Sequence, residues 1–257
     1  MVASIRIPAA PELHYLLRLG DTCLILGQRL GEWCGHGPIL EEDIALSNMA
    51  LDLIGQARAL LTLAGQKSGA GWDEDQLAFL RDEIDYRNPT LAELPRGDFA
   101  FTVLRNLALA TWLKLMWERL GDSSDTELAA IAGKAIKDAR YHQQHAADWA
   151  VRLGDGTDES RRRCEVALAA IWLYIPELFE DDTVDAAASA AGLGPAWSQL
   201  REPWLAEMGE VLGEAKLAVP PEATFRSSGK RGLHSEHMGY LLAEMQYLQR
   251  SYPGGAW

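Results

Sequence analysis

The chain has 257 residues, of which 48% are hydrophobic and 24% are charged, a composition typical of folded globular proteins. Its 24 Lys and Arg stand against 37 Asp and Glu, a formal net charge of -13, which argues against nucleic acid as the main partner. The most apolar runs, near 108–117 and 166–175, are shorter than the roughly 18–20 residues that cross a bilayer, so no membrane span is expected. The three cysteines form no Cys-x-x-Cys pair and no signal peptide precedes them, which favours the cytoplasm.

Helical periodicity dominates the chain, and strand signals are almost absent. In chain order the pattern predicts helices over 12–33 and 38–67, a short helix over 74–82, and further helices over 99–120, 125–153, 158–179, 196–217 and 234–250. Helices of 20 to 30 residues are roughly 30–45 Å long and pack best side by side. We therefore expect one all-α domain over residues 1–257, with no internal linker.

Local signals mark where several of these helices begin. Pro38 suits the first turn of the second helix, and Asp98 and Thr157 are expected N-caps. Ser124 and Glu127 have the spacing of a capping box.

A di-metal carboxylate site in such a bundle requires two Glu-x-x-His pairs, because this spacing aims a carboxylate and an imidazole at one ion. None of the six histidines has an acidic residue three positions before it, so a standard di-iron site cannot be assembled from this chain. The pairs His142/His145 and His234/His237 leave a mononuclear zinc site open. The alternative is that they are ordinary helix residues, since Asp138 and Asp148 offer local partners to the first pair.

Two polar helix faces admit two interpretations. One face belongs to the second helix, and the other to the helix over 125–153; their members are Glu41, Asn48, Asp52 and Gln56, and Lys134, Lys137, Asp138, Tyr141 and His142. If the faces met inside the bundle, Lys ammonium groups would neutralise buried carboxylates. Otherwise both are solvated faces or interfaces.

The segment 227–232 is the most compact basic stretch, with Lys230 and Arg231 between glycines. It could approach a phosphate. It is not a P-loop, however, and a solvated loop is the simpler expectation. The nine tryptophans are expected to be core and interface anchors rather than a cofactor site.

Three long strings carry a resemblance: residues 17–58, residues 134–160 and residues 229–250. Through them, and over nearly the whole chain from Tyr15 to Trp257, the sequence resembles the family of non-catalytic C components of the bacterial phenylacetyl-CoA 1,2-epoxidases, ring-oxygenating multicomponent monooxygenases of phenylacetate degradation. The resemblance implies a ferritin-like helical bundle with additional C-terminal helices. It implies that this chain holds no metal and no catalytic residue, and pairs with the catalytic A component, which carries the di-iron centre. Further epoxidase subunits and a reductase using NADPH with flavin and iron–sulfur groups would complete the complex.

The resemblance also suggests a small contribution to the site for phenylacetyl-CoA. The candidate residues are Asp85, Tyr86, Arg87 and Asn88, then Ala186, Ala187 and Ala188, and with them the basic pair Lys230 and Arg231. Chemically, Tyr86 could stack on adenine and Arg87 could meet a phosphate. Two other functions stay open: an acyl-CoA-binding or regulatory helical module, and a stand-alone metalloenzyme built on one of the histidine pairs.

Overall fold

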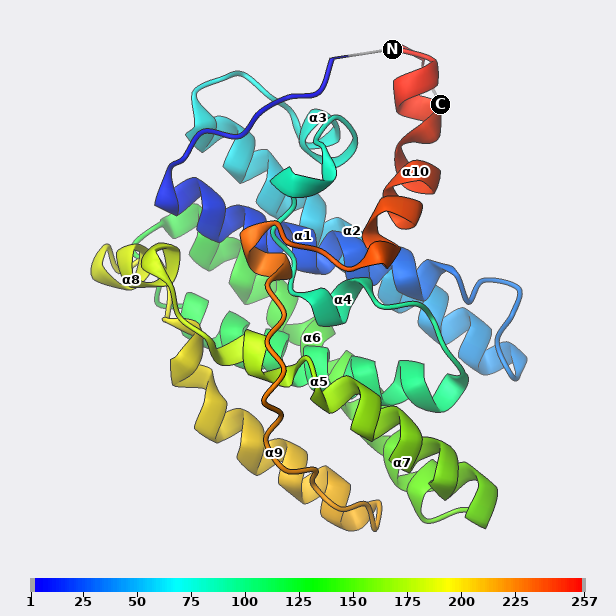
Figure 1. The fold of residues 1–257 in the computed structure, drawn as a ribbon. Helices are drawn as coiled ribbons and strands as arrows, with labels where there is room; N and C mark the ends of the chain where they lie inside the picture. The colour runs from blue at the N-terminus through cyan, green and yellow to red at the C-terminus, as the bar shows by residue number, and fades with distance from the viewer. Residues whose placement is uncertain (1–2, 256–257) are drawn as a thin grey trace. The chain divides into compact units, whose positions relative to one another are not determined.

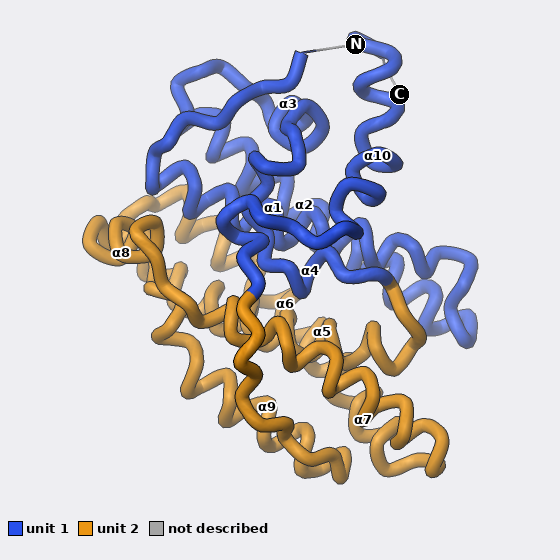
Figure 2. Tube along the Cα trace, in the orientation of Figure 1, with its two compact units in different colours: residues 1–95, 227–257 blue, residues 96–226 orange. Residues whose placement is uncertain are grey.

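The computed structural model describes residues 3–255, which form ten α-helices and four short 3-10 helices with only two isolated β-bridges (Figure 1). The expected all-α class is therefore confirmed. The chain divides into two compact units: unit 1 comprises residues 1–95 and 227–257, and unit 2 comprises residues 96–226 (Figure 2). The single domain over 1–257 stays a prediction.

Unit 1 is built around two long helices, α1 and α2, that pack along one another (Figure 1). Its elements are α1 (Pro11–Gly31), α2 (Leu40–Ser68), α3 (Glu74–Phe79), η1 (Glu83–Asp85), α4 (Thr90–Glu93), η4 (Gly229–Arg231) and α10 (Glu236–Ser251). Helix α10 contacts α3, η1 and α4. The last part of unit 1 in sequence therefore packs against the segment that follows α2.

The backbone conformation at Ile39 and Gly69 sets where α2 begins and ends. Pro38 lies before the helix rather than in its first turn, because Ile39 is the extended N-cap residue and the helix begins at Leu40. At the other end Gly69 has a φ of 66°, the left-handed conformation that stops a helix and favours glycine. The Pro38 prediction was therefore wrong by two residues.

Unit 2 surrounds the largely buried helix α5, which contacts α6, α7 and α9. Its elements are α5 (Phe99–Leu120), α6 (Thr126–Gly154), α7 (Asp158–Trp172), η2 (Ile175–Phe179), α8 (Thr183–Ala190), η3 (Trp197–Leu200) and α9 (Arg201–Glu214). Two indole groups form hydrogen bonds that join α5 to η2 and to α9. Trp112 donates to the carbonyl of Leu178 at 3.2 Å, and Trp204 donates to that of Ala108 at 2.8 Å. Both indoles are fully buried, as expected of core anchors.

The predicted helix starts are confirmed in part. Asp98 accepts from the backbone N–H of Phe101, and Thr157 forms a capping box with Ser160. The box at Ser124 was wrong: Asp125 is the N-cap of α6, since the Ser124 hydroxyl donates to the carbonyl of Ala191 at 3.0 Å. The helix predicted over 158–179 stops at Trp172, and a 3-10 turn containing a proline follows.

Helix α5 is long and apolar enough to cross a membrane by length and composition, contrary to the expectation that no such stretch exists. However, 83% of the most apolar 18-residue stretch of this helix is buried inside the protein. A core helix passes the same test, and this burial is what a core helix shows.

Candidate functional site

Unit 1 contains a chain of polar side chains, all buried except the half-buried Arg87, that is called here the buried network. It joins α1, the segment 81–93 and the segment 229–246, and its members are Asp21, Arg81, Tyr86, Arg87, Asn88, Glu93, His234 and Gln246. A charge removed from water is stable only when paired and hydrogen-bonded, so such groups must be positioned together.

The ion pair of Asp21 and Arg81 lies at one end of the buried network. Both side chains are fully buried, and both oxygens of Asp21 accept from the guanidinium, one of them at 2.9 Å. The backbone N–H of Arg87 donates to Asp21 at 2.8 Å, and Gln246 on α10 donates to the carbonyl of Arg81 at 3.0 Å. One pair thereby joins α1, the loop after α3, and α10.

The other end of the buried network is the pair of Glu93 and His234, whose side chains are also fully buried. His234 Nδ1 lies 2.6 Å from a Glu93 oxygen, and Nε2 lies 3.2 Å from the carbonyl of Tyr86. Burial lowers the pKa of His234, but the hydrogen bond and charge of Glu93 outweigh it, so the pKa is raised above its ordinary value. Because both ring nitrogens face acceptors, the arrangement favours the doubly protonated imidazolium.

The structure brings the predicted residues Tyr86, Arg87 and Asn88 into the buried network. The Tyr86 hydroxyl donates to the carbonyl of Ala78 and its ring is fully buried, so it presents no face for an adenine. The Arg87 guanidinium donates to the carbonyls of Ile84 and Tyr86, and Asn88 donates to Glu93 at 2.9 Å. Stacking by Tyr86 is therefore contradicted in this conformation. Asp85 lies beside them, where its carbonyl accepts from Arg81.

The basic segment is not the solvated loop that the sequence favoured. Gly229–Arg231 forms a 3-10 turn, and the backbone N–H of Gly229 donates to the Thr90 hydroxyl at 3.1 Å. Lys230 is buried, with 1% of its surface exposed, whereas Arg231 is exposed. The two cations therefore do not share one solvent-facing site for a phosphate.

The remaining candidates, Ala186, Ala187 and Ala188, lie on α8 in unit 2. Ala186 is exposed, Ala187 is half-buried and Ala188 is fully buried. These residues and the segment 85–88 thus belong to different compact units.

Metal-ligand geometry is missing from the described residues. Within residues 3–255, no group of three His, Cys, Asp or Glu side chains is placed to share a metal ion. His142 is buried and His145 half-buried on α6, while His234 is held by Glu93. The side chains present therefore do not fit a di-iron or mononuclear zinc centre.

The two polar helix faces are mostly solvated. Glu41 and Asn48 on α2 are exposed, as are Lys134 and Lys137 on α6. Gln56 is the buried member of the α2 face, and the Cys23 thiol lies 3.7 Å from its side-chain oxygen. The interpretation that Lys groups neutralise buried carboxylates is not supported at these positions.

Sequence reasoning missed the acidic partners of the buried network. Asp21 and Glu93 are its two buried carboxylates, and each accepts from several donors. Asp21 could have been found from its position within the apolar segment of the first helix, because a carboxylate there must be paired when it is buried. No local pattern marked Arg81 as that partner, because 60 positions separate them.

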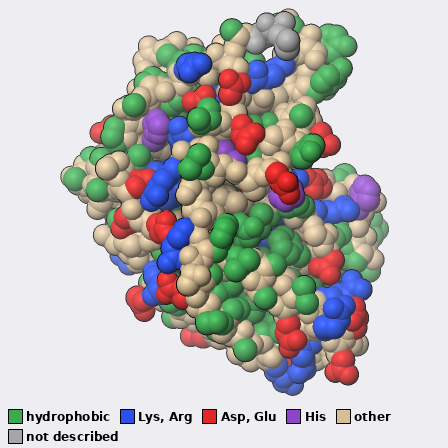
Figure 3. Space-filling view, viewed as in Figure 1, with side chains coloured by type: hydrophobic (Ala, Val, Ile, Leu, Met, Phe, Trp, Pro, Cys, Tyr) green, Lys and Arg blue, Asp and Glu red, His purple; other side chains and the backbone are tan. Residues whose placement is uncertain are grey.

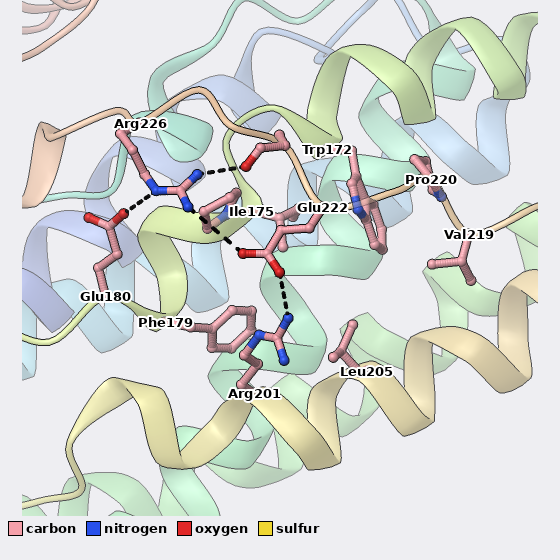
Figure 4. A pocket seen from close by; sticks show the side chains of 12 residues that line it. Trp172, Ile175, Phe179, Glu180, Arg201, Leu205, Val219, Pro220, Glu222 and Arg226 are labelled. Atoms are coloured by element: carbon pink, nitrogen blue, oxygen red, sulfur yellow. Dashed lines mark hydrogen bonds and ion pairs between the residues drawn. The ribbon is translucent and has the colours of Figure 1, made fainter.

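Unit 2 contains a cavity of about 200 Å³ that the sequence did not indicate (Figure 4). Its apolar walls include Trp172 on α7, Phe179 on η2 and Leu205 on α9. Residues 219–226, called here the strap, cross its mouth without helix or strand structure. On the face in view, hydrophobic side chains gather over unit 2 with charged ones around them (Figure 3).

Helix α2 presents an exposed apolar stripe, defined here as Leu40, Ile44, Leu51 and Ile54. Leu40 is 72% exposed and Leu51 is 66% exposed. A Cβ built on Gly55, next to Ile54, would meet nothing within 4 Å. The stripe is thus an open helix surface, bordered by the polar residues Glu41 and Asn48.

Comparison with known proteins agrees with the sequence patterns. A sequence model of the family described as phenylacetic acid catabolic protein matches residues 6–257. The chain is 50% identical over 243 residues to the C component of the 1,2-phenylacetyl-CoA epoxidase of Escherichia coli strain K12, covering 95% of this chain and 98% of that protein. The expected ferritin-like helical class agrees with both this match and the helical structure.

Proposed function

The chain belongs to the phenylacetic acid catabolic protein family, and on that premise we propose that it is a non-catalytic structural subunit of an epoxidase complex. The complex would be a multicomponent di-iron oxygenase that epoxidises the aromatic ring of phenylacetyl-CoA. This chain would pair with the metal-bearing catalytic subunit, which it would stabilise. The name of the Escherichia coli relative and the near-complete coverage of that protein support the assignment.

The α2 stripe is the observation that best supports pairing with the catalytic subunit. Exposed apolar side chains that share one helix face with polar neighbours are typical of a protein–protein interface, because burying them removes apolar area from water. Leu40, Ile44 and Leu51 repeat at spacings of four and seven, which places them on one helix face. Such a face suits another helix, and the open surface at Gly55 allows close approach.

The lack of a metal-ligand group among the described residues supports the proposed division of labour. In the proposed complex the di-iron centre would lie in the catalytic subunit. A reductase carrying flavin and iron–sulfur groups would deliver electrons from NADPH. Further epoxidase subunits would complete the complex in the cytoplasm.

A direct part in acyl-CoA binding is not favoured for the candidates within unit 1 that are buried or internally bonded, whereas the exposed Arg231 and Ala186 stay candidates. Tyr86, Asn88 and Lys230 are buried, and the Arg87 guanidinium is hydrogen-bonded to backbone carbonyls. An effect of Tyr86, Arg87, Asn88 or Lys230 on the acyl-CoA site would act through the partner rather than by direct contact.

Co-expression with the family's catalytic subunit tests the pairing. The wild-type chain should co-purify with that subunit, and phenylacetyl-CoA epoxidation with reductase should require both. Leu51→Glu should abolish co-purification while leaving the thermal midpoint of the isolated chain nearly unchanged, since Leu51 is exposed.

Val166→Glu is the matched control, an exposed apolar residue on α7 in unit 2. It should leave co-purification intact. Normal pairing of Leu51→Glu would remove the stripe from the interface. Full epoxidation without this chain would contradict the structural role itself.

A further inference from the structure

The cavity in unit 2 is lined by apolar side chains from several elements. Trp172 and Ile175 form one side, Phe179 and Leu205 form another, and Val219 of the strap also lines the cavity (Figure 4). Trp172, Ile175 and Phe179 are themselves buried, so their positions are set by packing. An enclosed apolar space of about 150 Å³ is enough to bind benzene. The 200 Å³ here accommodates a phenyl ring with a short substituent.

Two guanidinium groups share one carboxylate at the mouth of this cavity. Arg201 Nη2 lies 3.0 Å from one oxygen of Glu222, and Arg226 Nη2 lies 3.8 Å from the other. Arg226 also contacts Glu180 at 2.9 Å through Nε (Figure 4). Arg201 contacts Glu202 at 3.2 Å through Nη1. The protein thus already holds a carboxylate between two arginines next to an apolar space.

Glu222 is held in this position by ion pairs between solvent-exposed side chains. Its side chain is 61% exposed, and it lies on the strap, which has no helix or strand structure. Ion pairs between exposed side chains contribute little to stability, because water solvates the separated partners well. Replacing the Glu222 carboxylate by another one would leave the charge balance at the mouth unchanged.

We propose that this cavity binds a small monocarboxylic acid with an aromatic or branched apolar body. The body occupies the space between Trp172, Phe179 and Leu205, and the carboxylate takes the place of Glu222 between Arg201 and Arg226. Guanidinium groups recognise carboxylates through paired N–H donors, which gives orientation as well as affinity. The site is too small for a CoA thioester, and the proposal does not depend on the assigned place of the chain in an oxygenase.

Phenylacetate is a suitable probe, because one carbon separates its ring from its carboxylate. Isothermal titration of the full chain should give saturable binding with a Kd between about 10 µM and about 1 mM, as expected for about ten non-hydrogen atoms. Arg201→Gln should weaken binding at least about tenfold, since one charged hydrogen-bonding partner is lost. Glu222→Gln should tighten it several-fold, because the internal competitor is removed.

Two matched controls separate this site from a general charge effect. Arg162→Gln removes an exposed arginine on α7 that also pairs with a glutamate, and it should not change phenylacetate binding. The neutral analogue phenylacetamide should bind weakly and equally to the wild type and Arg201→Gln. Leu205→Trp should fill the cavity and abolish binding of both probes.

Absence of saturable phenylacetate binding up to about 10 mM would overturn the proposal. So would equal weakening by Arg201→Gln and Arg162→Gln, or no tightening in Glu222→Gln. These three variants change exposed side chains, so they should fold even where Leu205→Trp does not.

Discussion

His234 illustrates how single buried side chains hold unit 1 together. Its ring lies between the carboxylate of Glu93 and the carbonyl of Tyr86, and both are acceptors. Glu93 in turn accepts from the backbone N–H of Ser235 at 2.6 Å. A neutral imidazole has one N–H and would leave one of these contacts without a proton. The protonation state of one residue therefore affects how the segment before α10 is held.

This pair predicts a pH dependence of stability. Because the pKa of His234 is raised in the folded chain, its contribution is full below about pH 6.5, the ordinary value, and is lost as pH rises through the raised pKa. Thermal unfolding of the wild type between about pH 5.5 and about pH 8.5 should show this decline. His234→Gln should be less stable at low pH and should lack that part of the slope.

His36→Gln is the control, because His36 is exposed. It should keep the wild-type slope. An unchanged slope in His234→Gln would show that other groups cause the dependence.

Asp21 and Arg81 differ from the surface ion pairs in their energetics. Both are fully buried, so removing one partner would leave an uncompensated charge, at a cost of about 3–5 kcal/mol. The pair does not by itself show a gain in stability, since an apolar pair of similar volume is often as good. Its effect is to define the position of α1 relative to the segment 81–87.

At the scale of the helix, α2 contains two glycines in opposite environments. A Cβ on Gly65 would lie 2.1 Å from the carbonyl oxygen of Trp72, whereas one on Gly55 would meet nothing within 4 Å. The close approach at Gly65 lets the chain turn back along the helix toward α3. That approach requires the residue with no side chain.

Gly65→Ala should therefore destabilise the chain by about 1–3 kcal/mol, because the Trp72 backbone must move. Gly55→Ala should stabilise it by about 0.5–1 kcal/mol, since alanine lowers the entropy lost in a helix. Urea denaturation of both variants measures the difference. Equal effects at the two positions would contradict the close approach at Gly65.

The helices were predictable where a local signal marks their ends. The range 99–120 was correct to the residue, since Asp98 is a strong N-cap. Helix α8 was missed because its eight residues are too short to show periodicity. The contacts of Tyr86 with His234 and Gln246 could not be foreseen, because they join segments 148 and 160 residues apart in sequence. The contact of Gly229 with Thr90, 139 residues apart, is of the same kind.

The whole molecule belongs to a ferritin-like helical class, but its described side chains form no group that could bind a metal ion. Elemental analysis of the purified chain, expressed with ample iron and zinc, should show metal well below one equivalent. One or two equivalents, lost when His142 or His234 is replaced, would instead indicate a metalloenzyme. His36→Gln again supplies a control for non-specific binding by exposed imidazole.

Unit 1 is composed of residues 1–95 and 227–257, so the two stretches that form it are synthesised at different times. A ribosome producing roughly 5–20 residues per second needs on the order of ten seconds to translate residues 96–226. During that interval Glu93 and Arg81 have emerged, but His234, Gln246 and Arg250, which bind them, have not. The N-terminal part of unit 1 therefore exists for that interval without its C-terminal part. The Glu93 carboxylate lacks His234, and the backbone carbonyl of Arg81 lacks Gln246 and Arg250. Unit 2 is synthesised during the same interval.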